Sequence, residues 1–123
     1  MSYVEKVSVT VTTDASGDGT EYTPVMVGKV RNIIYTKGDY DAGVDFAITN
    51  ENTDQDIWSE DSVDASKTVS PRQEVHNAAG NVLVNDIDGS PIIGDICLDK
   101  DRIKIVVANG GNAKTGQFWI VVG

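Results

Sequence analysis

The sequence is short of the residues that build catalytic and metal sites. Its 123 residues include one cysteine and one histidine. A single cysteine excludes a disulfide bond within the chain, and the two residues together are too few for a tetrahedral Cys/His zinc site. We therefore expect a chain that folds in a reducing cytosol, with its stability supplied by core packing or by partners.

Basic residues and long apolar runs are also scarce. Ten Lys and Arg stand against 19 Asp and Glu, a formal charge of −9 at pH 7. Nucleic acids and anionic membranes both bind basic surfaces, so we expect neither as a partner. The longest apolar runs, such as WIVV at residues 119–122, fall far short of the about 20 residues that span a bilayer. The first residues lack the basic and apolar regions of a signal peptide, so we expect none.

Known catalytic motifs are absent from the sequence as well. It has no nucleophile elbow and no zinc-protease helix motif. GGNAKTG at residues 110–116 contains a Lys-Thr pair without the spacing of a phosphate loop. His76 stands alone beside a turn, and Cys97 reads as a small buried hydrophobic residue. We expect a protein that is not an enzyme and binds no cofactor.

The sequence is rich in apolar and polar residues that alternate with a period of two, the pattern of half-buried strands. Turn signals separate the strand-like segments at intervals of roughly 8–12 residues, which favours a sandwich or barrel. We predict an all-β fold, an antiparallel, jelly-roll-like β-sandwich of about eight to ten short strands. Residues 1–123 form one domain with an extended N-terminal arm. The clearest alternating segments are residues 3–13, 29–37, 44–49, 102–109 and 117–122.

Two pairs of these segments are close in sequence and read as hairpins. Residues 102–109 and 117–122 are joined by the Gly/Asn-rich residues 110–116, which predicts a C-terminal hairpin. Residues 29–37 and 44–49 are joined by the turn GDYDAG, which predicts a second hairpin.

The turn DASGDGT at residues 14–20 has a faint calcium-loop spacing. Asp14 and Asp18 are candidate ligands, and Glu21 could complete the set. An EF-hand, however, needs a bidentate Glu at its twelfth position, where this sequence has Val25. We expect a plain turn, with Asp14, Asp18 and Glu21 kept as a weak metal candidate.

The segment of residues 50–66 is the least strand-like part of the chain. Between residues 38 and 66 there are nine acidic residues and no Lys or Arg. One interpretation is a solvated loop anchored by Trp58. The alternative is an acidic contact loop for a basic partner surface.

Three blocks of the sequence resemble a family of small tailed-bacteriophage virion proteins that decorate, or cement, the capsid. The blocks are residues 28–53 (GKVRNIIYTKGDYDAGVDFAITNENT), 70–80 (SPRQEVHNAAG) and 101–123 (DRIKIVVANGGNAKTGQFWIVVG), about half of the chain. The resemblance implies a jelly-roll-like sandwich on the outside of a phage head. It also implies the major capsid protein as partner, self-association as a homodimer or homotrimer, and synthesis in the cytoplasm of the host bacterium.

For such a protein we expect capsid or oligomer contacts from the N-terminal arm, from aromatic anchors and from the acidic segment. Core packing is an equal alternative for Tyr35 and Trp58. The expected contact residues are Met1, Ser2, Tyr3, Val4, Tyr35, Tyr40, Asp54, Asp56, Trp58, Glu60, Asp61 and Asp64.

A second class of function stays open on the sequence alone. The alternative is another virion or surface β-sandwich that binds a partner. Examples are a head-fibre base, a tail-associated module and a carbohydrate-binding domain. Carbohydrate modules stack sugars on exposed aromatic rings, so an exposed Trp119 with a neighbouring Tyr would favour that alternative.

Overall fold

The computed structural model describes residues 4–84 and 86–123 and places them in ten β-strands. Within these residues there is no helix, and hence none that could cross a membrane. The strands are β1 (Glu5–Thr12), β2 (Gly19–Tyr22), β3 (Met26–Thr36), β4 (Asp45–Asn50), β5 (Asp56–Glu60), β6 (Lys67–Val69), β7 (Arg72–Glu74), β8 (Ile93–Asp101), β9 (Ile103–Ala108) and β10 (Thr115–Val122).

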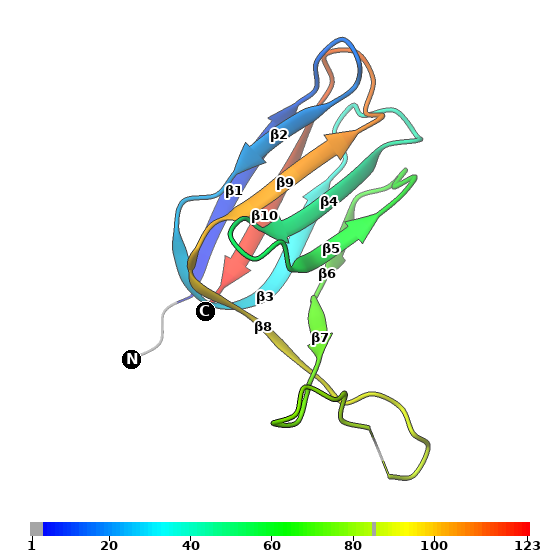
Figure 1. Cartoon of the computed structure of the whole chain (residues 1–123). Helices are drawn as coiled ribbons and strands as arrows, with labels where there is room; N and C mark the ends of the chain where they lie inside the picture. The colour runs from blue at the N-terminus through cyan, green and yellow to red at the C-terminus, as the bar shows by residue number, and fades with distance from the viewer. Residues whose placement is uncertain (1–3, 85) are drawn as a thin grey trace.

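The strands form two antiparallel sheets that pack face to face (Figure 1). One sheet has the order β1-β10-β3-β8-β7, with β6 also paired to β3, and the other has the order β2-β9-β4-β5. Four strand pairs are nested in the sequence, from the outermost to the innermost: β1 with β10, β2 with β9, β3 with β8 and β4 with β5. This is the connectivity of a jelly roll, so the predicted fold class is confirmed.

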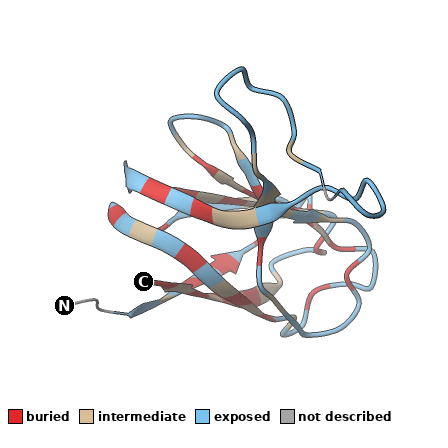
Figure 2. Ribbon diagram, turned by 90° about the horizontal axis from the view of Figure 1, so that it is seen from below, coloured by how far each residue is buried: buried red, intermediate tan, exposed pale blue. Residues whose placement is uncertain are grey.

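The core lies between the two sheets and is built from the inward half of each alternating strand. Figure 2 shows buried and exposed residues alternating along the strands of both layers. Since successive side chains of a strand point to opposite faces, one face of each strand supplies the core. In β9 the buried apolar side chains are those of Ile103, Ile105 and Val107, and in β10 they are those of Phe118, Ile120 and Val122.

Both predicted hairpins are wrong in their pairing, although the strands themselves are present. β9 lies in the four-stranded sheet and β10 in the six-stranded sheet, so the connection at residues 109–114 crosses from one layer to the other. β3 and β4 are separated in the same way. Alternation shows which side chains face the core, but two strands that face the same core from opposite sheets have the same pattern as a hairpin.

Two further expectations are corrected by the structure. β5 is an edge strand paired to β4, with one register shift, inside the segment that the sequence predicts to be a loop. Cys97 is exposed and not buried. In β8 the inward positions belong to Ile96 and Leu98, and the residue between them must therefore point outward.

The connection from β5 to β8 is a long insertion in the jelly roll. β6 pairs with Ile33–Tyr35 of β3, and β7 pairs with the start of β8. Between Glu74 and Ile93 the chain leaves the sandwich and projects from it (Figure 1). We refer to the described residues of this projecting segment, 75–84 and 86–92, as the arm.

Candidate interaction surfaces

The structure does not assemble the weak calcium candidate. One carboxylate oxygen of Asp14 accepts hydrogen bonds from the backbone N–H groups of Ser16 (2.8 Å) and Asp18 (3.1 Å). This is the Asx-type turn that the sequence predicts. Within residues 4–84 and 86–123, no group of three or more His, Cys, Asp or Glu residues is placed to hold a metal ion.

Tyr35 and Tyr40, which we expected at a contact surface, lie in the core. Their side chains are 1% and 2% exposed, so neither can reach a partner. Tyr35 packs with its ring centroid 4.9 Å from that of Phe46 and 5.1 Å from that of Phe118. Burial raises the pKa of Tyr35 to about 12, with a smaller contribution from the charge of Asp64. Burial also raises the pKa of Tyr40 well above its ordinary value.

Trp58 is half-buried at the margin of this aromatic cluster. Its ring meets Phe46 edge-on at 4.6 Å between centroids, so it covers the open side of the core. The indole N–H donates to Glu60 (3.3 Å), and Glu60 also binds Lys67 at 2.7 Å. The hydrogen bond from Lys67, and then that from Trp58, lower the pKa of Glu60. The predicted contact residues Trp58 and Glu60 thus already have partners within the chain.

The other predicted acidic contacts remain on the surface, over β5 and its flanking turns. Asp64 is mostly exposed and lies 3.5 Å from the ammonium of Lys37. The N-terminal arm is described only from Val4, which is 63% exposed; Met1, Ser2 and Tyr3 lie outside the described residues. The exposed acidic residues of this set are Asp54, Asp56, Asp61 and Asp64.

A shallow hollow of about 180 Å³ lies on the outer face of the four-stranded sheet, over β4, β5 and β9. Its floor is formed by small apolar side chains of Ala47, Val106 and Ala108. Asp45 at its rim accepts hydrogen bonds from the backbone N–H of Ser62 (2.8 Å) and the side chain of Asn109 (2.7 Å), which lower its pKa. The Asp45 carboxylate therefore already binds both the loop that contains Ser62 and the loop that contains Asn109.

The arm is an ordered element held by its own backbone. Three hydrogen bonds join its three passes in a triangle: Val75 N–H to Ile92 C=O, Leu83 N–H to Val75 C=O, and Ile92 N–H to Leu83 C=O, each 2.8–2.9 Å. The Asn77 side chain closes the first turn by accepting from two backbone N–H groups, and Asp88 caps the second. The arm is therefore a folded double turn.

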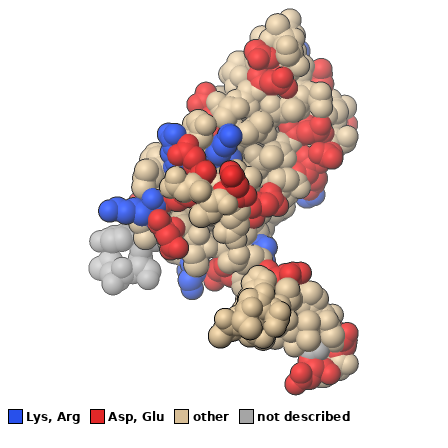
Figure 3. All heavy atoms as spheres, in the orientation of Figure 1, with Lys and Arg blue, Asp and Glu red and all other residues tan. Residues whose placement is uncertain are grey.

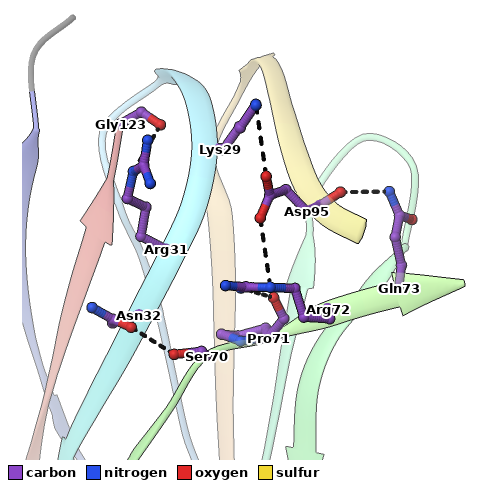
Figure 4. Close-up of polar contacts among 9 residues, drawn as sticks. All are labelled: Lys29, Arg31, Asn32, Ser70, Pro71, Arg72, Gln73, Asp95 and Gly123. Carbon is purple, nitrogen blue, oxygen red and sulfur yellow. Dashed lines mark hydrogen bonds and ion pairs between the residues drawn. The ribbon is translucent and has the colours of Figure 1, made fainter. Parts of the chain in front are cut away.

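A polar network around Asp95 fixes the base of the arm to the sandwich (Figure 4). Its two carboxylate oxygens lie 3.6 Å from the ammonium of Lys29 and 3.6 Å from Nε of Arg72. Its backbone carbonyl accepts from the side-chain amide of Gln73 at 3.0 Å. Because Lys29 belongs to β3 and Arg72 to β7, the network joins β7, the strand that leads into the arm, to the body.

Unlike the body, the arm has no core of its own. None of its described residues is buried, yet several of its side chains are large and apolar. Residues 75–84 include no Asp, Glu, Lys or Arg. Figure 3 shows the arm as largely uncharged, with acidic residues near its tip, below a body that carries most of the charge. The exposed large apolar residues of the arm and of the adjoining end of β8 are Val82, Val84, Ile87, Ile92 and Ile93.

Sequence reasoning missed this surface. The sequence places His76 beside a turn and includes residues 70–80 in the resemblance, but neither observation predicts that the segment projects from the sandwich. The available signal was the combination of an uncharged stretch, residues 75–84, with apolar side chains in a chain of charge −9.

Two aromatic side chains bear on the carbohydrate-binding alternative. Trp119 is half-buried on the outer face of β10, and the ammonium of Lys6 lies 4.7 Å from its ring centroid. Tyr22 on β2 is 39% exposed, and the guanidinium of Arg102 lies 4.1 Å from its ring centroid. Each ring already stacks with a cation of the same chain, which competes with a sugar for that face.

Comparisons with known proteins assign the chain to no family. No family model matches it, and neither does any curated protein. Among solved structures, the chain is similar to the exo-β-1,3-galactanase of Phanerochaete chrysosporium with galactose, at 13% sequence identity and a TM-score of 0.31 over 95% of this chain. The chain spans 27% of the length of that protein. A similarity at this level says nothing of activity.

Proposed function

We propose that this chain is a structural protein of a tailed-phage virion, which decorates the outside of the capsid and stabilises it by bridging neighbouring capsid subunits. It acts by binding and not by catalysis. The observation that carries the proposal is the arm, which is ordered, projecting and apolar and has no buried residue among those described. The resemblance noted in the sequence supports it, because the middle block of that resemblance, residues 70–80, covers β7 and the first turn of the arm.

The energetics favour a partner that covers the arm. Large exposed apolar patches are uncommon on proteins that function alone, and they mark interaction sites. Fully burying an exposed Val or Ile side chain contributes about 1.5–3 kcal/mol, and Val84 and Ile92, which are 50% and 44% exposed, would each contribute about half of that. One arm of this size binds weakly, but many copies on one lattice sum. A protein that binds only the assembled lattice stabilises that lattice by mass action.

The charge distribution separates two modes of contact. The acidic body stays soluble and away from packaged DNA. Asp86 and Asp88 lie near the tip of the arm, but residues 75–84 are uncharged, so binding through residues 75–84 depends only weakly on salt. Binding through the acidic residues of β5 and its flanking turns to a basic capsid patch weakens steeply with salt, because salt screens exposed charges.

The test is co-sedimentation of the purified protein with emptied and expanded phage heads, at low and high salt. We expect saturable binding near one copy per capsid subunit, with little dependence on salt. The substitution Val84→Asp places a charge in the arm and should weaken binding at least about tenfold. Val25→Asp is the matched control, because Val25 is similarly exposed, lies on the body and gives the same change in net charge.

The outcomes separate the alternatives. Equal loss of binding in both variants would mean that the added charge, and not the arm, weakens the contact. A steep salt dependence with no effect of Val84→Asp would assign the contact to the acidic surface instead. No binding to any assembled lattice contradicts the proposal, and binding to a glycan array in its place would support the carbohydrate-binding alternative.

A further inference from the structure

We infer that the free edge of β1 pairs with the same edge of a second copy of this chain, joining two six-stranded sheets into one continuous sheet across a two-fold axis. The inference rests on the fold alone and holds whether or not the proposed function is right. It names a specific interface for self-association.

β1 is a long strand with a neighbour on one side only. Its eight residues, Glu5–Thr12, pair with β10, and no other described strand pairs with them. An open strand edge of this length presents a row of backbone N–H and C=O groups that can pair with another chain. Proline, a bulge or a covering segment often protects such an edge. Within the described residues β1 has no proline and no bulge, and Gly19 covers its edge only at Thr12.

The register shows which backbone groups are free. Thr13 donates its N–H to the carbonyl of Lys114 at 2.8 Å, in line with the β1–β10 register. In an antiparallel pair, hydrogen-bonded positions alternate along the strand. The odd-numbered residues of β1 therefore bond to β10, and the N–H and C=O groups of Lys6, Ser8 and Thr10 point to the open side. Beyond them the edge closes, because Gly19 at the start of β2 lies against the carbonyl of Thr12.

Two copies of the same strand edge can pair with each other as antiparallel strands when a two-fold axis relates them. Pairing centred on Ser8 places Ser8 opposite Ser8 of the second copy and Lys6 opposite Thr10 of the second copy. All of these are hydrogen-bonding positions, and opposite residues share one face of the joined sheet. The register also keeps the buried residues, Val9 and Val11, on the core side.

Charge selects β1 over the other edges as the contact between two copies of an acidic chain. β1 has one acidic residue and one basic residue, Glu5 and Lys6, and in this register neither lies opposite its own copy. β5 includes Asp56 and Glu60 and no basic residue, so its self-pairing would bring like charges together. β2 and β7 have only four and three residues.

The test is the mass of the full chain in solution over a range of concentrations, measured by sedimentation equilibrium. We expect a monomer–dimer equilibrium that Ser8→Pro weakens at least about tenfold. Proline removes one outward N–H and fits an edge strand, where that side of the strand has no partner in the same chain. Ser8→Ala is the control, because it removes the hydroxyl and keeps the N–H, and it should dimerise normally.

Cross-linking tests the register independently of stability. In a Cys97→Ser background, Ser8→Cys should form a disulfide-linked dimer on mild oxidation, because the two copies of residue 8 face each other. Thr10→Cys in the same background should not, since its two copies lie roughly 13 Å apart along the strands. A monomer at millimolar concentration, or efficient cross-linking at residue 10 and not at residue 8, overturns the inference.

Discussion

At the scale of single residues, Tyr40 and Tyr35 allow one substitution to be compared in two settings. Both side chains are buried and their rings stack at 6.5 Å. The Tyr40 hydroxyl donates to the carbonyl of Val11 at 2.5 Å. The Tyr35 hydroxyl is buried with no hydrogen-bond partner among residues 4–84 and 86–123. The same chemical group therefore contributes differently to stability at the two positions.

We predict that Tyr40→Phe lowers the free energy of unfolding by about 1 kcal/mol, the usual net contribution of a hydrogen bond. Tyr35→Phe should leave it unchanged or raise it, because it removes a buried polar group that is unpaired. Urea denaturation of both variants, monitored by tryptophan fluorescence, measures the difference. Equal losses would contradict the prediction, because the paired and the unpaired hydroxyl would then contribute equally to stability.

Residue by residue, the sequence predicts which positions alternate but not always which of them face inward. Tyr35 and Tyr40 were expected on a surface because aromatic residues anchor interfaces, and the same large apolar rings fill the core of this small sandwich. Cys97 was expected inside because it lies among apolar residues. Ile96 and Leu98 on either side of it point into the core, so in an alternating strand Cys97 points outward. Aromatic and thiol side chains are compatible with both settings, so composition alone could not decide.

At the scale of elements, the connection between β3 and β4 depends on one glycine. Gly38 has a φ of 60°, and a Cβ atom built there would lie 2.2 Å from the carbonyl oxygen of Thr115 at the start of β10. The same connection is joined to β10 by the Asp39 N–H, which donates to that carbonyl at 3.2 Å. The atoms that a side chain at Gly38 would meet are backbone atoms of β10 and not a flexible side chain. A side chain there must therefore displace the backbone.

We predict that Gly38→Ala lowers the free energy of unfolding by more than about 2 kcal/mol, from the left-handed backbone strain and the clash together. Gly43→Ala in the same connection is the matched control. It meets nothing within 4 Å and should change stability by no more than about 0.5 kcal/mol. Thermal unfolding followed by circular dichroism compares the two, and similar melting temperatures would contradict the prediction.

The elements were more predictable than their partners. The strand segments β1, β3, β4, β9 and β10 follow from alternation, and the turns follow from Gly, Asn and Asp. The pairing does not, because a short link between two alternating strands can be a hairpin or a crossing between layers. β5 was missed because its acidic and polar residues resemble a loop, and only pairing with β4 makes Asp56–Glu60 a strand.

At the scale of the whole molecule, the jelly roll and the arm contribute differently to the free energy of unfolding. Every buried residue of the chain that the structure describes lies outside the arm. The arm is joined to the sandwich through the β7–β8 pairing and the polar contacts of Asp95. The sequence could not predict this division, because the arm's residues form turns and short bridges like those of an ordinary loop. The body supplies stability, and the arm supplies exposed apolar surface.

This division leads to a prediction for the arm's removal. Glu74 and Ile93 lie opposite each other in the β7–β8 register, so replacing residues 75–92 with Asn-Gly joins them through a two-residue hairpin turn. The free energy of unfolding should change by no more than about 1 kcal/mol, because no buried apolar contact is lost and a shorter loop costs less closure entropy. Dimer formation through β1 should persist, while binding to phage heads should be lost. A loss of several kcal/mol in urea denaturation would instead make the arm part of the folding unit, and retained head binding would remove it from the contact.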